Sequence, residues 1–88
     1  MARFVLLLEF KNEDDRLKVR PAHREHLQAL LEQGRLVTAG PWADDKGAMH
    51  IYEVEDEAEL REILDRDPYT AVDAYDIALL KEWTPILP

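Results

Sequence analysis

The chain reads Arg-Phe-Val-Leu-Leu-Leu-Glu-Phe from Arg3 to Phe10. This apolar run is too short for a helix of usual length, and it indicates a β-strand that is apolar on both faces. The polar residues 11–15 that follow predict a loop. The chain therefore opens with a strand whose two faces both favour burial.

A helix is predicted over about residues 20–33. Pro21 suits the first turn of a helix, where its missing N–H would have no partner, and Gly34 suits the C-terminal stop. Leucines follow His23 at offsets of four, seven and eight residues, which all lie on one helical face. His23 is thus expected at the N-terminal end of the buried stripe.

The rest of the chain alternates between strand and helix patterns. The expected elements are a strand over 36–39 that stops at Gly40-Pro41, a strand over 48–54, a helix from the N-cap Asp56 to Asp67-Pro68, one helical turn within 69–74 and a strand over 75–83. This β-α-β-β-α-β order is that of the ferredoxin-like fold, an α+β fold in which two helices cover one face of a four-stranded antiparallel sheet. We expect residues 1–88 to form one domain, because a chain of this length supports one modest core.

The other face of such a sheet has no helix to cover it. The first and last predicted strands are apolar on both faces, so this open face would expose a large apolar patch, and patches of that kind usually mark an interface. We expect a homodimer whose sheets face each other. Assembly beyond the dimer is left open.

Composition excludes several classes of protein. The chain has 19 acidic and 11 basic residues, a net charge of −8, which disfavours nucleic acid and anionic membranes as partners. There is no cysteine, so disulfides and thiolate metal sites are absent. The apolar run at the start is interrupted by Glu9 and Lys11, too early for a signal peptide or a membrane span. A cytoplasmic location is the expectation.

His23 and Asp67 are the candidate proton-transfer residues. Histidine changes its charge close to neutral pH, which suits a general acid or base. Asp67 precedes Pro68 at the end of the second helix, and its carboxylate could reach His23 on the neighbouring antiparallel helix and orient the imidazole. The alternatives are a core histidine bonded to a backbone carbonyl and an aspartate that only forms a turn.

Further residues could bind a substrate near this pair. Arg20 could bind an anionic group beside the free N–H groups of the helix start, or it could simply be solvated. Gly40 and Pro41 permit close approach of a ligand, and Trp42, Tyr69 and Trp83 could line a pocket or belong to the core. A metal site built from His23, His26 and His50 is disfavoured, because no acidic ligand pattern completes it.

Three segments together resemble the YciI-like (YCII-related) family: Arg20-Pro21-Ala22-His23, Ala39-Gly40-Pro41 and Asp67-Pro68-Tyr69. The resemblance extends over nearly the whole chain and implies a dimeric α+β barrel. It also implies an active site made of a His and an Asp, here His23 and Asp67. Many relatives have a longer loop after Gly-Pro and often a Ser near the next strand, whereas this loop is short and Ala48 stands near that place, so the resemblance leaves a hydroxyl contact to the substrate open.

The resemblance leads to a hypothesis about function. The protein would be a lyase or isomerase that needs no cofactor and moves a proton on a small cyclic or phenolic compound. Shared fold does not transfer function, so a non-catalytic dimeric module that binds a small molecule or regulates a partner is the alternative. In a third interpretation His23 and Asp67 only join the two helices structurally.

Overall fold

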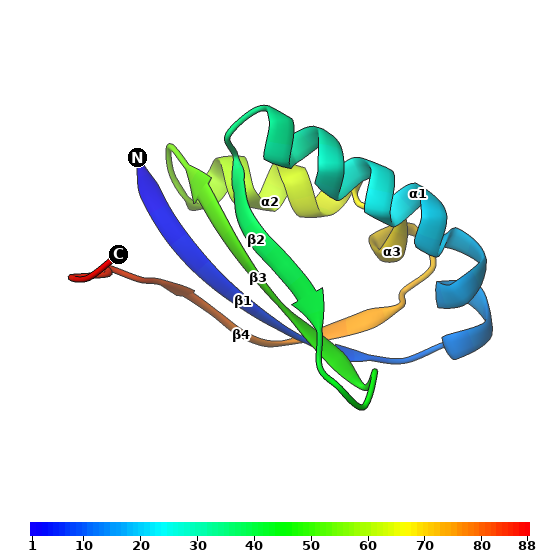
Figure 1. Cartoon of the computed structure of the whole chain (residues 1–88). Coiled ribbons are helices and arrows are strands. Elements are labelled where there is room, and N and C mark those ends of the chain that lie inside the picture. The colour runs from blue at the N-terminus through cyan, green and yellow to red at the C-terminus, as the bar shows by residue number, and fades with distance from the viewer.

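The first strand lies in the middle of a four-stranded antiparallel sheet. The computed structural model describes residues 1–88 and orders the strands β2-β3-β1-β4. The helices all lie on one face of this sheet (Figure 1), so the predicted ferredoxin-like α+β fold is confirmed. The elements in chain order are β1 (Ala2–Phe10), α1 (Glu13–Glu32), β2 (Leu36–Pro41), β3 (Gly47–Val54), α2 (Glu57–Arg66), α3 (Pro68–Ala71) and β4 (Tyr75–Glu82). None of the helices is long and apolar enough to cross a membrane.

The core forms between β1 and the helices because side chains alternate across the strand. Phe4, Leu6 and Leu8 are buried toward the helices, while Val5 and Leu7 lie on the opposite face and are only partly buried. The strand that is apolar on both faces is thus a central strand of the sheet, and the helices cover only one of its faces. The remaining buried members of the core are Leu30, Leu36, Tyr52, Val54, Leu60, Ile63 and Leu64.

Helix α1 begins seven residues earlier than the sequence suggested. It starts at Glu13, after Asn12 in the left-handed conformation, and Pro21 lies inside it. Acidic residues fill the first turn, where they interact favourably with the helix dipole. Because Pro21 has no N–H, the carbonyl of Leu17 loses its helical partner, and Figure 1 shows the first turns set at an angle to the rest.

This correction changes the surroundings of two candidate residues. His23 is not at a helix N-terminus, and Arg20 lies two turns away from the free N–H groups of the helix start. The prediction failed because a proline was assigned to the first turn, whereas here the helix accepts it at a bend. The residues read as a loop, 11–15, include the real first turn.

The second helix is capped as its sequence predicts. The Asp56 side chain accepts a hydrogen bond from the Glu59 backbone N–H at 2.9 Å, and the Glu59 carboxylate accepts one from the Glu55 N–H at 3.3 Å. Asp67 then takes an extended conformation, as expected before Pro68, and becomes the N-cap of α3. The helix α3 therefore begins directly at the point where α2 ends.

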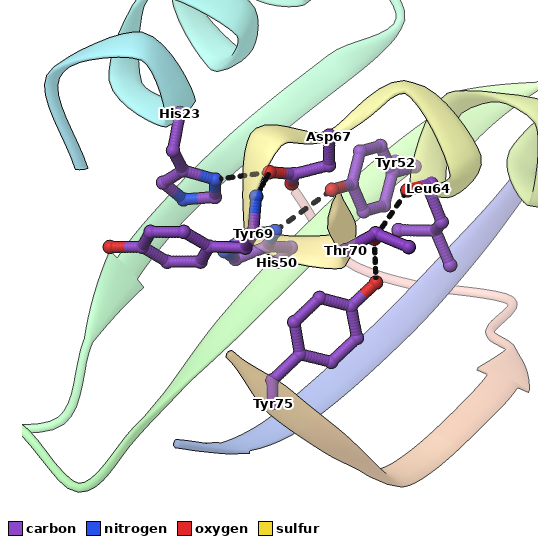
Figure 2. Close-up of polar contacts among 8 residues, drawn as sticks. All are labelled: His23, His50, Tyr52, Leu64, Asp67, Tyr69, Thr70 and Tyr75. Carbon is purple, nitrogen blue, oxygen red and sulfur yellow. Dashed lines mark hydrogen bonds and ion pairs between the residues drawn. The ribbon is translucent and has the colours of Figure 1, made fainter. Parts of the chain in front are cut away.

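Strand β4 is tied to the end of α2 through two hydroxyl groups. Thr70 Oγ1 contacts the Leu64 carbonyl oxygen and the Tyr75 hydroxyl, both at 2.6 Å (Figure 2). A carbonyl can only accept, so the single hydrogen of Thr70 goes to Leu64 and Tyr75 must donate to Thr70. The hydrogen-bond direction is thus fixed along this chain of groups.

The β2–β3 hairpin is closed by a turn that depends on Gly47. Pro41 pairs with Ala48, so β2 continues through Gly40-Pro41 and does not stop before it. This is tolerated because Pro41 lies on an edge strand. A Cβ atom on Gly47 would collide with the Leu8 carbonyl and would lie 2.9 Å from Trp42 Nε1, whereas a Cβ on Gly40 meets nothing within 4 Å.

We expect Gly47→Ala to lower the free energy of unfolding by about 1–3 kcal/mol, because backbone atoms must move to admit the methyl group. Gly40→Ala is the matched control and should change the same quantity by less than about 1 kcal/mol. Urea denaturation followed by circular dichroism measures both. Equal effects of the two substitutions would contradict the assignment of Gly47 as the glycine that the hairpin requires.

Candidate functional site

A cleft of about 130 Å³, named the His23 cleft here, opens between α1, α3 and the β2–β3 hairpin. Its wall carries three arginines, two histidines and one carboxylate among apolar side chains. Charged and titratable groups gathered in one small cleft mark a candidate functional site. The lining residues are Phe10, Arg16, Arg20, His23, Arg24, Leu27, Ala39, Gly40, Pro41, Asp45, Ala48, His50 and Tyr69.

The structure brings His23 and Asp67 into direct contact. His23 Nδ1 lies 2.7 Å from Asp67 Oδ1, and the two side chains are only 7% and 2% exposed (Figure 2). The same Asp67 oxygen accepts a hydrogen bond from the Tyr69 backbone N–H at 2.9 Å. Because this oxygen acts as an acceptor, the hydrogen of a neutral His23 ring sits on Nδ1, and Nε2 keeps its lone pair.

Tyr69 fixes the plane of the His23 ring. The two rings are stacked with centroids 3.7 Å apart and an interplanar angle of 4°. Tyr69 is in turn held by an edge contact with Phe10, at 5.9 Å and 83°. The stack therefore fixes the orientation of the imidazole.

His50 is a second histidine of the cleft. It is 2% exposed, its Nδ1 lies 2.8 Å from the Tyr52 hydroxyl, and its ring centroid is 5.8 Å from that of His23. Burial lowers the pKa of His50 to about 4, and repulsion from protonated His23 acts in the same direction. Burial likewise raises the pKa of Tyr52 well above its ordinary value. Both groups are therefore neutral near pH 7.

Arg16 is the most deeply buried charge in the cleft. Its side chain is 3% exposed, its Nη2 lies 3.1 Å from Asp45 Oδ2, and its guanidinium sits 4.2 Å above the centre of the Phe10 ring. Burial acts against the charged form, but hydrogen bonds to Asp45 and Tyr69 outweigh it and raise the pKa of Arg16. Arg16 therefore remains a cation inside the protein.

The predicted binding residues fall into two groups. Arg20, Gly40, Pro41 and Tyr69 line the His23 cleft, whereas Trp42 lies outside it, 42% exposed and against Gly47. Trp42 was a candidate for the wall of a pocket, but β2 runs on to Pro41 and the tryptophan does not line the cleft. Trp83 is also outside, beyond the end of β4.

Two residues of the cleft were missed from sequence. Arg16 escaped notice because the helix was predicted to begin at residue 20, yet it precedes Arg20 by four residues, the spacing of one helical face. His50 was considered only as a metal ligand, although strand alternation places it on the helix-facing side between Ala48 and Tyr52. His26 lines a different cleft, and no group of three or more His, Asp or Glu side chains is placed to hold a metal ion.

Comparison with known proteins identifies the family. The family model described as the YCII-related domain matches residues 2–84. The chain belongs to the YCII-related domain family. Protein YciI of Escherichia coli O6:H1 and Protein YciI of Shigella flexneri are each 36% identical to it over 83 residues, covering 83% of this chain and 85% of the relative. The resemblance drawn from the three sequence segments is confirmed.

A solved structure shares the fold of this YCII-related chain. It is 5-chloro-2-hydroxyhydroquinone dehydrochlorinase from Burkholderia phenoliruptrix AC1100, in complex with 2,5-dihydroxybenzoquinone. The TM-score is 0.78 at 20% sequence identity, with 93% of each chain covered. The likeness at this identity establishes the shared fold.

We expect the buried neutral His50 to make the protein less stable in acid. The unfolded chain binds a proton on this residue below pH 6.5, whereas the folded chain does so only near pH 4, so stability falls as the pH drops through this window. Between pH 7 and pH 5 the wild type should lose about 2 kcal/mol more than His50→Gln. Urea denaturation of both proteins at the two pH values measures this difference. Parallel losses in the two proteins would show that His50 is not held neutral by the fold.

Proposed function

We propose that this YCII-related protein is a lyase or isomerase that needs no cofactor and moves a proton on a small cyclic or phenolic compound. The observation that carries the proposal is the buried contact of 2.7 Å that Asp67 makes with His23, which lines the cleft. His23 is the proton-transfer group, and Asp67 is the positioning residue that acts through it.

The geometry supports a complete proton cycle on His23. Asp67 holds the hydrogen on Nδ1, so the Nε2 lone pair is the site that removes a proton from the substrate. The imidazolium formed in this step is stabilised by the carboxylate. Return of the proton to another substrate atom completes an isomerisation. In an elimination the substrate instead loses its leaving group as an anion, and His23 then releases the proton to solvent.

A neutral His50 fits this cycle. A second imidazolium 5.8 Å from His23 would repel the first and hinder its protonation. Because the pKa of His50 is about 4, it stays uncharged at the pH values where His23 is expected to work. His50 can then offer a hydrogen bond in the cleft without opposing the charge on His23.

The substrate class comes from the structural relative. That enzyme is a dehydrochlorinase whose name and ligand both describe hydroxylated six-membered rings. Dehydrochlorination removes a proton and a chloride ion, so it needs a proton acceptor and no redox cofactor. A small cleft with one proton-transfer centre among both apolar and charged side chains suits a similar reaction in this protein.

Turnover should depend on both members of the pair. With chlorinated hydroquinones as test substrates, we expect His23→Gln and Asp67→Asn to lower kcat/KM by about 10²–10⁴-fold, the usual contribution of a positioned proton-transfer group. The change in absorbance of the substrate's aromatic ring and the release of chloride measure the reaction. His26→Gln is the matched control, since it lies one turn further along α1 and lines another cleft.

Full activity of folded His23→Gln would refute the mechanism. Binding of the compounds by the wild type without any product would favour a small-molecule-binding or regulatory module instead. If His23→Gln and Asp67→Asn lost stability equally without any effect on turnover, His23 and Asp67 would be only a structural link between the helices.

The open face of the sheet supports association into a homodimer. Leu7 of β1 lies between Met49 of β3 and Leu79 of β4 in the strand register, and Val5 lies beside Ile51. These five apolar side chains form a continuous patch, and no helix covers it (Figure 1). We infer that a second copy of the chain covers this patch, because exposed apolar area of this kind promotes association.

Met49→Lys should shift the protein toward monomer, because a lysine in the centre of the interface would lose its hydration. Leu31→Lys is the matched control on the exposed side of α1 and should leave the assembly unchanged. Sedimentation velocity at micromolar concentration distinguishes the monomer from the dimer. A wild type that sediments as a monomer would contradict the inferred interface.

A further inference from the structure

The His23 cleft is positively charged in a protein that is strongly negative overall. Arg16, Arg20 and Arg24 follow each other at intervals of four residues on α1 and all line the cleft, while Asp45 is the single carboxylate in its wall. The net charge of the whole chain is −8. A local excess of cationic side chains in a protein with a negative net charge indicates a site that recognises an anion.

The buried Arg16 has hydrogen-bonding capacity that the protein does not use. A guanidinium offers five N–H donors, and the Nε of Arg16 is buried with no partner. A side chain that is 3% exposed cannot turn to bulk water to satisfy this donor. An unpartnered donor on a buried cation that lines a cleft points to a ligand with acceptor oxygens.

Asp45 shows where such oxygens would lie. Its Oδ2 atom is 3.1 Å from Arg16 Nη2 and 4.0 Å from Arg20 Nη1, so one carboxylate oxygen already lies between the two guanidinium groups. Asp45 is 45% exposed, on the turn between β2 and β3, and has a positive φ of 58°. A ligand carboxylate carries the same charge and could take the place of this one on the two guanidinium groups.

We propose that the cleft binds small organic acids, with the ligand carboxylate on Arg16 and Arg20 in place of Asp45 and the remainder of the molecule directed toward His23. This inference deepens the proposed function, since it makes the substrate of that reaction a ring compound that bears a carboxylate. The guanidinium fork matches the two oxygens of a carboxylate. Arg20 lies one turn before His23 on α1, so one small molecule can contact both.

Titration of the protein with benzoate, followed by NMR and calorimetry, tests the proposal. Benzamide is the neutral probe of the same shape, and it should bind at least tenfold more weakly than benzoate. We expect Arg16→Gln to weaken benzoate at least tenfold and Asp45→Asn to strengthen it severalfold, because the second substitution removes the competing carboxylate. Arg61→Gln makes the same change of charge as Arg16→Gln, at an exposed pair with Glu57 on α2, and should alter benzoate affinity by less than twofold.

Arg16→Lys is the second variant, for use if Arg16→Gln does not fold. It keeps the charge and the aliphatic stem but loses the fork, and it should weaken benzoate severalfold. Equal affinities for benzoate and benzamide would overturn the proposal. Wild-type affinity in a folded Arg16 variant, or weaker binding in Asp45→Asn, would do the same.

The binding test is independent of the chemistry at His23. His23→Gln should retain benzoate affinity within about threefold while it loses turnover. Full turnover in that variant refutes the proton-transfer mechanism and leaves the anion site standing. Loss of discrimination between benzoate and benzamide refutes the anion site and leaves the mechanism standing.

Discussion

One oxygen atom, Asp67 Oδ1, joins the elements that build the candidate site. It accepts hydrogen bonds from the His23 ring on α1 and from the Tyr69 backbone N–H at the start of α3. A buried carboxylate is costly unless its acceptors are filled, so the position of Asp67 requires both donors. The same contact begins α3 and brings the Tyr69 ring over His23. The relative placement of the three helices thus follows from satisfying a single buried charge.

From this point the site extends as a row of packed side chains. His23 stacks on Tyr69, and Tyr69 makes an edge contact with Phe10. The guanidinium of Arg16 lies over the ring of Phe10. The proton-transfer end and the cationic end of the cleft are therefore connected by packed aromatic side chains rather than by a mobile loop. The two proposed functions, removing a proton and holding a charged group, need a fixed separation, and the side chains that would perform them pack on one support.

Local patterns were enough to predict the sheet and the order of elements, because β1 is a short apolar run bounded by polar residues and α2 has a capping box before its apolar face. The end of α2 at Asp67 was also predictable, because a proline favours an extended conformation in the residue before it. The start of α1 was not predictable. Prolines occur most often in the first turn of a helix, and nothing in the sequence indicated that Pro21 lies at a bend within one. Arg16 was missed with that segment, and Trp42 was misplaced because the end of β2 depends on cross-strand pairing with β3. The contact between the two histidines lies between elements far apart in sequence, which local patterns do not encode.

The bend at Pro21 has a kinetic consequence. The pyrrolidine ring of Pro21 fixes the backbone φ angle between the turn that carries Arg16 and the turn that carries His23, which limits how far these two turns can move before a ligand arrives. A preformed site loses little conformational entropy on binding, and association then proceeds without a slow rearrangement. The positive wall of the cleft would speed the encounter of an anion with this acidic protein, and added salt would slow it by screening that attraction.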